Sequence, residues 1–221
     1  MTESHIIWRE RHIIDAFKGL TAPFVLLVMV WTQSLDRFDA WAYLSVHGMY
    51  GLIWVIKSRV FGDRNWERPL RPFRVLLLVT GLGGYWVAPV VLCLHEVPAP
   101  AAMVGAGVAL FGLGVFLHFT ADMQKHMHLQ HRPGVLLTEG LWARSRNPNY
   151  LGELLIYTAF CVLAQHWLPV VLFTCVVLLE WVPNMRRKDQ SLARYPEFTA
   201  WKAQSGLLLP RLSLSDLMRR D

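Results

Sequence analysis

The sequence predicts an all-α protein: a polytopic membrane bundle of about six transmembrane helices, with the N and C termini on the cytoplasmic side. Three observations lead to this fold class. Hydrophobic residues make up 54% of the 221 residues, more than soluble domains usually contain. They gather in six apolar segments, and a helical crossing needs roughly 20 such residues. The basic residues occupy alternate connections between these segments.

The apolar segments follow one another along the whole chain. They cover residues 20–35, 41–56, 75–94, 101–121, 150–167 and 168–182. The first two are short for a full crossing. The last two almost touch, and the Gln-His-Trp-Leu-Pro stretch at residues 165–169 predicts a tight helical hairpin between them. Tryptophans lie near several segment ends, as in the aromatic belts of membrane proteins.

The placement of charge predicts the orientation. Of the 22 Lys and Arg residues, 21 lie before the first segment, in the second or fourth connection, or after the sixth segment. Positive side chains favour the cytoplasmic side, so both termini are expected there. The net charge of +6 follows from this topology, and we expect no nucleic-acid partner. The expected location is a bacterial inner membrane, with an active site that faces the cytoplasm.

A polar run at residues 140–153, GLWARSRNPNYLGE, stands where the fourth connection re-enters the membrane. Pro148 disfavours a helix that arrives from the N-terminal side, so the next helix is predicted to start near Asn149. Asn149, Tyr150 and Glu153 then share roughly one helical face. A carboxylate at the start of a membrane helix is costly unless it binds something. The alternative is interfacial anchoring by Arg and Trp.

Two more polar groups lie at segment ends on the same side. His118, Asp122 and Lys125 recur at helical spacing, and could bind a ligand or form a surface ion pair. Arg186 and Asp189 share a face after the sixth segment, where cations also suit the helix end. Further along, apolar residues at intervals of three predict an amphipathic tail that packs on the bundle: Leu192, Tyr195, Phe198 and Trp201.

The second segment carries its own polar face. His47, Tyr50 and Trp54 lie on one side of the predicted helix, and Gly48 and Gly51 permit close helix packing. Tyr50 is a candidate proton donor in a lipid-shielded pocket, or part of a polar contact between helices. The histidines at 126, 128 and 131 do not complete a metal site, and we expect no metal. The sequence has no GxGxxG and no phosphate loop, so side chains of several helices would have to hold a nucleotide.

Several of these motifs resemble a known enzyme domain. Asp122-Met-Gln-Lys125, Gly140-Leu-Trp142 and Asn147-Pro-Asn-Tyr-Leu-Gly-Glu153, with the Arg186-Arg-Lys-Asp189 run and the tail up to Pro210, resemble the C-terminal domain of steroid 5α-reductases and sterol C14 reductases. The resemblance covers roughly residues 118–212. It implies an enzyme that binds NADPH in a cytoplasm-facing cavity and reduces a carbon–carbon double bond in a lipophilic steroid-, sterol- or isoprenoid-like substrate.

The resemblance also implies residue roles. Expected cofactor contacts are His118, Asp122, Lys125, Trp142, Arg146, Asn147, Asn149, Tyr150, Glu153, Arg186 and Arg187. Expected catalytic residues are Tyr50, as proton donor, and Asp189, near the reacting carbon. On this reading residues 1–98 and 99–221 belong to one membrane domain, the first part facing the substrate and membrane lipid and the second binding the cofactor.

One departure from the family pattern and one competing resemblance keep alternatives open. The steroid 5α-reductases use a glutamate of an early span to engage the substrate carbonyl, and residues 20–35 contain no acid. The isoprenylcysteine carboxyl methyltransferases and phospholipid N-methyltransferases have a similar hairpin and Arg-x-Pro-x-Tyr-x-Gly run, and they bind S-adenosylmethionine. Asn147, Glu153 and Asp122 favour the reductase. A membrane protein without enzymatic activity is the third possibility.

Overall fold

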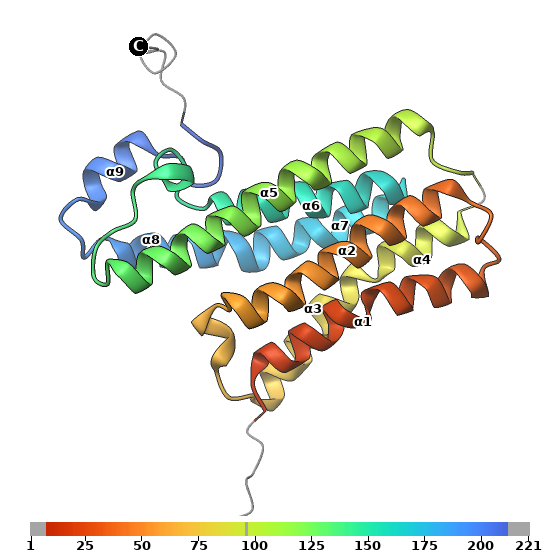
Figure 1. Cartoon of the computed structure of the whole chain (residues 1–221), viewed down its shortest axis with the longest axis horizontal. Helices are drawn as coiled ribbons and strands as arrows, with labels where there is room; N and C mark the ends of the chain where they lie inside the picture. The colour runs from red at the N-terminus through yellow and green to blue at the C-terminus, as the bar shows by residue number, and fades with distance from the viewer. Residues whose placement is uncertain (1–7, 96, 212–221) are drawn as a thin grey trace, which may run out of the picture. The chain divides into compact units, whose positions relative to one another are not determined.

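The structure is a computed structural model that describes residues 8–95 and 97–211. It confirms the all-α fold class: the chain is 76% helix, with no strand among the described residues. The elements, shown in Figure 1, are α1 (Glu10–Trp31), α2 (Phe38–Val60), η1 (Arg64–Glu67), α3 (Pro72–Tyr85), α4 (Val87–Leu94), α5 (Ala101–His131), η2 (Gly140–Trp142), α6 (Pro148–Ala164), α7 (Trp167–Val176), the π-helical η3 (Val177–Trp181), α8 (Val182–Leu192) and α9 (Phe198–Gln204).

All six predicted segments are helical, but they are not equally suited to crossing a membrane. Among the described residues, four helical runs are long and apolar enough to cross: α1, α3 with α4, α5, and α7 through α8. These four runs are consistent with an integral membrane protein. α6 has 17 residues, which at about 1.5 Å each fall short of a hydrocarbon core of roughly 30 Å. α2 is longer but is not among these four runs; it carries His47 in its middle and charged residues only near its ends. The count of six crossings therefore stays a prediction.

The chain forms two compact units. The first unit contains residues 1–111 and 157–174, and the second contains residues 112–156 and 175–221. The division does not follow the chain at residue 98, because α5, α6 and the run from α7 to α8 each contribute to both units. The assignment of substrate and cofactor to residues 1–98 and 99–221 stays a prediction.

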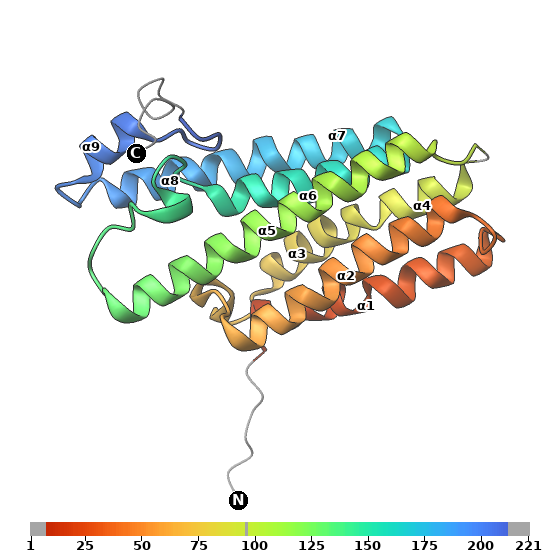
Figure 2. The ribbon, with the colours of Figure 1, turned by 45° about the horizontal axis from the view of Figure 1, so that its top comes forward.

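In the first unit, α1 and α2 lie side by side, as Figures 1 and 2 show. Glycines of α2 make this close approach possible. A Cβ atom at Gly48 would lie 2.9 Å from the Cβ of Ala22, and one at Gly51 would overlap the carbonyl oxygen of Lys18. The short hairpin between α6 and α7 also belongs to this unit: α6 ends at Ala164 and α7 begins at Trp167, as predicted.

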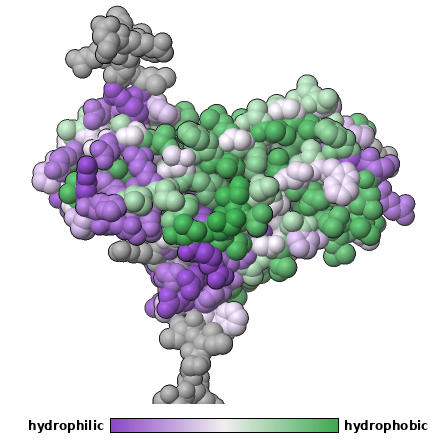
Figure 3. Space-filling model, viewed as in Figure 1, coloured by the Kyte–Doolittle hydropathy of each residue, from purple (hydrophilic) through white to green (hydrophobic). Residues whose placement is uncertain are grey.

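The surface of the first unit is apolar along its helices. Hydrophobic side chains cover the middle of α1 and hydrophilic ones gather at its N-terminal end (Figure 3). Leu27, Trp31 and Leu76 are 66%, 69% and 62% exposed. Contiguous apolar surface of this kind is rare on soluble proteins and suits contact with lipid.

In the second unit, α5 and α6 meet at two glycines. A Cβ at Gly114 would lie 2.7 Å from the carbonyl oxygen of Gly152. A Cβ at Gly152 would overlap the backbone nitrogen of His118. Such close backbone contact is a common way for membrane helices to associate, and here it brings His118 next to the start of α6.

Gly152→Ala is expected to destabilise the protein by about 1–3 kcal/mol, because the added methyl group must push the two backbones apart. Melting in detergent, followed by circular dichroism, measures this. Gly112→Ala is the matched control, since a Cβ there meets nothing within 4 Å. An equal effect of both substitutions would show that the close contact does not exist.

Candidate functional site

The polar run at residues 140–153 is fixed at both ends in the second unit. At its start, Gly140 adopts a φ of 60°, and Gln124 of α5 accepts a hydrogen bond from the Leu141 N–H (3.2 Å) and donates one to the Glu139 carbonyl (2.9 Å). At its end, α6 begins at Pro148, one residue before the predicted start. Proline suits the first helical turn, because the N–H that it lacks would have no helical partner there.

His118 and Asp122 of α5 lie beside Asn149 of α6, which the sequence placed in a separate polar group. Asn149 donates a hydrogen bond from Nδ2 to Asp122 Oδ1 (3.0 Å). Nδ1 of His118 lies 3.1 Å from the carbonyl oxygen of Asn149, and since a carbonyl only accepts, Nδ1 carries the proton. Nε2 of His118 lies 3.7 Å from Asp122 Oδ2. The start of α6 is therefore tied to α5 through three polar side chains.

Two buried atoms of this cluster make no hydrogen bond among the described residues: Nε2 of His118, which lies near Asp122 Oδ2, and Oδ1 of Asn149. A buried acceptor without a donor costs about 1–3 kcal/mol, so such atoms are rare unless a ligand or water completes them. The amide is held in place by its own Nδ2 bond to Asp122. The cluster therefore presents a fixed acceptor suited to the N–H or O–H group of a ligand.

Arg146 and Asp189 form a second cluster with the tail of the chain. Nε of Arg146 donates to both carboxylate oxygens of Asp189, at 3.1 and 3.0 Å, and the two side chains are 8% and 13% exposed. The Arg146 guanidinium also donates to the carbonyl of Ser205. Lys188 donates to the Arg146 carbonyl (2.7 Å) and to Asn147 Oδ1 (2.9 Å). We name this set of Arg146, Asn147, Lys188, Asp189 and Ser205 the tail clasp.

Trp142 connects the tail clasp to the amphipathic tail. The Lys188 ammonium lies 4.4 Å from the centre of the Trp142 ring. The carbonyl of Trp142 accepts a hydrogen bond from the Trp201 indole (2.8 Å). Trp201 packs with Leu136 and Phe198, with Leu192 and Tyr195 against them. The predicted tail residues thus form one small apolar core. Burial of this core fixes the segment that carries Arg146 and Asn147.

The remaining predicted contacts have separate places in the second unit. Tyr150 lies edge-on to Trp181 at a centroid distance of 5.2 Å. Lys125 and Glu153 are half-buried, one turn after Asp122 and Asn149 respectively. Arg186 and Arg187 are exposed on α8. The second unit therefore contains all eleven predicted cofactor contacts. Two of them, Arg146 and Asn147, already form hydrogen bonds within the tail clasp.

Tyr50, the other predicted catalytic residue, lies in the first unit. It is fully buried, and its ring centre is 4.2 Å from the ammonium of Lys18. Lys18 is 6% exposed and donates a 2.7 Å hydrogen bond to the hydroxyl of Tyr157. Trp54 and Tyr85 also face this ammonium, at 4.8 and 5.7 Å.

Sequence reasoning missed the roles of Lys18 and Lys188. Each stands beside an apolar segment, where a lysine is usually explained by topology. Lys18 contacts residues 139 positions away, a distance over which no local pattern gives a signal. For Lys188, the signal was its position on the same face as Met185 and Leu192, which are buried or half-buried. Ser205 carried no sequence signal.

The sequence profile of one protein family covers most of the chain. The family described as "Protein of unknown function (DUF1295)" matches residues 25–204, and the chain belongs to it. The match includes the His118, Asp122 and Asn149 cluster and every member of the tail clasp except Ser205. No curated protein and no solved structure is significantly similar to the chain.

Proposed function

We propose that this member of the DUF1295 family is an integral-membrane reductase, which uses NADPH to reduce a carbon–carbon double bond in a lipophilic substrate. The active site would face the cytoplasm of a bacterial cell, as the sorting of basic residues predicts. The observation that carries the proposal is the Asp122–Asn149 pair with its buried, unsatisfied amide oxygen. An amide such as that of nicotinamide offers an N–H group for this oxygen.

The charge of the second unit supports a polyanionic cofactor. Residues 112–156 and 175–211 contain ten Lys or Arg and six Asp or Glu. An excess of four positive charges attracts the phosphates of NADPH and repels the sulfonium cation of S-adenosylmethionine. This is why the reductase is preferred to the methyltransferase.

The tail clasp refines the roles that the resemblance implies. The guanidinium of Arg146 already donates hydrogen bonds to Asp189 and to the Ser205 carbonyl. In the proposal, these bonds hold the backbone at Arg146 in place and so position Asn147 beside the start of α6. In the proposal, Lys125 and the exposed Arg186 and Arg187 take the phosphates. Glu153, one turn along α6 from Asn149, holds a polar edge of the cofactor.

The chemistry divides between cofactor and protein. NADPH supplies the hydride when bound. The proposed proton donor is Tyr50, because Asp189 uses both carboxylate oxygens to accept from Arg146. Tyr50 is fully buried, and a proton donor shielded from water suits transfer to a lipophilic substrate.

Thermal melting of the purified protein in detergent tests the proposal. NADPH at about 100 times its dissociation constant is expected to stabilise the fold by about 2.7 kcal/mol, which corresponds to a rise in Tm of roughly 5–10 °C. S-adenosylmethionine is expected to give no rise. The opposite result, stabilisation by S-adenosylmethionine alone, would establish the methyltransferase class. No response to either ligand would support a protein without enzymatic activity.

A further inference from the structure

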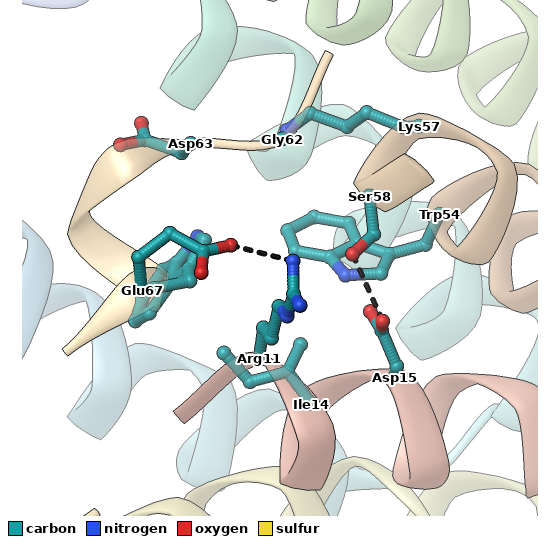
Figure 4. Close-up of a pocket in the computed structure, with 10 residues that line it drawn as sticks. Arg11, Ile14, Asp15, Trp54, Lys57, Ser58, Gly62, Asp63 and Glu67 are labelled. Atoms are coloured by element: carbon teal, nitrogen blue, oxygen red, sulfur yellow. Dashed lines mark hydrogen bonds and ion pairs between the residues drawn. The ribbon is translucent and has the colours of Figure 1, made fainter. Parts of the chain in front are cut away.

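The first unit contains a pocket that plays no part in the proposed reaction. It lies between the N-terminal half of α1, the C-terminal end of α2 and the turn at η1, has room for a group of about the size of one water molecule, and opens to the surface. Figure 4 shows its lining, which includes Arg11 and Asp15 of α1, Trp54, Lys57 and Ser58 of α2, Asp63, and Glu67 of η1. Groups of both charges thus line a single small space.

On the negative side of the pocket, one carboxylate oxygen of Asp15 lacks a hydrogen-bond donor among the described residues. Asp15 is 11% exposed, and its Oδ2 accepts a 2.9 Å hydrogen bond from Ser58 and lies 3.9 Å from Nε of the exposed Arg59. Its Oδ1 is buried and has no hydrogen-bond partner among the described residues. A buried carboxylate oxygen needs a donor, and a charged donor satisfies it best.

The positive side is formed by Lys57 and Arg11. Lys57 is 5% exposed, and its ammonium lies 4.5 Å from the centre of the Trp54 ring. Arg11 donates to Glu67 (2.8 Å). The hydrogen bond from Arg9, together with the charge of Arg11, holds the pKa of Glu67 below its usual range. Glu67 therefore stays ionised at neutral pH, and it keeps the Arg11 side chain in the pocket wall.

The surroundings of the pocket present both hydrophilic and apolar surface. Ile56 and Val60, on the same end of α2, are 52% and 63% exposed, and Leu20 of α1 is 55% exposed. Hydrophilic surface gathers at this end of α1 and hydrophobic surface follows along the helix (Figure 3). A ligand with a charged head and acyl chains matches both surfaces at once.

We propose that this pocket binds the headgroup of a membrane phospholipid that carries a primary ammonium, the phosphoethanolamine type. Its ammonium donates to Asp15 Oδ1 and its phosphate lies beside Lys57 and Arg11. A choline headgroup has no N–H to donate, and a glycerol headgroup brings no positive charge. Neither therefore meets the need of Asp15 as well.

Native mass spectrometry of delipidated protein in detergent measures this preference. The probes are phosphatidylethanolamine, phosphatidylcholine and phosphatidylglycerol with identical palmitoyl and oleoyl chains. Phosphatidylethanolamine is expected to bind about tenfold more tightly than either of the others, the usual value of one charge-assisted hydrogen bond. Soluble glycerophosphoethanolamine, the same head without chains, is expected not to compete at equal concentration.

Variants assign the preference to the pocket. Asp15→Asn keeps an acceptor for Ser58 but loses the charge, and is expected to bring phosphatidylethanolamine down to the level of phosphatidylcholine. Lys57→Met is expected to weaken all three lipids, and Lys57→Arg to restore them. Asp36→Asn, at an exposed carboxylate between α1 and α2, is the control and is expected to bind as the parent protein does.

Each other outcome overturns the proposal. Equal binding of the three lipids, or a preference that survives Asp15→Asn, removes the pocket as a selective headgroup site. Competition by glycerophosphoethanolamine at equal concentration would identify a soluble ligand instead of a lipid. Asp122→Ala, in the second unit, is expected to leave the lipid preference intact, so failure of the reductase proposal would not affect this result.

Discussion

Asp189→Ala is expected to destabilise the protein by about 3–5 kcal/mol, because it leaves the guanidinium of Arg146 buried with no opposite charge. In a chain of this length that corresponds to a fall in Tm of roughly 10 °C or more. Differential scanning calorimetry in detergent measures it. The effect arises from the tail clasp and requires no cofactor.

The double variant Arg146→Met/Asp189→Leu is the control for this prediction. It removes both charges and fills the space with apolar atoms, so it is expected to recover most of the lost stability. If Asp189→Ala melts within about 1 °C of the parent protein, the ion pair contributes nothing to the free energy of unfolding. Asp189 would then again be a candidate catalytic residue.

Asp122→Ala is expected to weaken NADPH binding by about 10- to 100-fold, the usual value of one or two hydrogen bonds to a charged group. The substitution removes the carboxylate that orients the Asn149 amide, so the unsatisfied oxygen loses its fixed position. Fluorescence titration of NADPH against the purified variant measures the change.

Glu139→Ala is the matched control. Glu139 is also a carboxylate of the second unit, but it pairs with Arg132 where both side chains are about 60% exposed. Exposed pairs contribute little, so the variant is expected to bind NADPH as the parent protein does. Equal loss in both variants would mean that binding depends on overall charge and not on the Asp122–Asn149 pair.

The sequence predicts the fold well because the membrane imposes simple rules. Apolar length locates the helices, and proline and charge locate their ends: Pro148 starts α6, and the turn around Gln165 separates α6 from α7. The number of crossings follows less surely, because α6 is short and α2 carries buried polar side chains such as His47, so hydropathy alone does not decide whether either helix crosses.

The candidate site is predictable in part. Helical spacing singles out His118 and Asp122, and a motif singles out Asn149, but their contact is seen only in the fold. The pairing of Arg146 with Asp189, 43 residues later, depends on how the tail folds back over residues 144–147. The same holds for Asp15 and Ser58, which are brought together by the glycine contacts of α1 and α2. Long-range pairing of this kind has no local signature in one sequence.

Photolabelling tests the central claim, that the second unit binds NADPH, most directly. A photoreactive azido-adenine analogue of NADP is irradiated with the purified protein, and the labelled peptides are identified by mass spectrometry. We predict label on peptides from residues 112–156 or 175–211, suppressed by excess NADPH and not by S-adenosylmethionine. Label that NADPH does not suppress, or label confined to residues 8–95, would contradict the account.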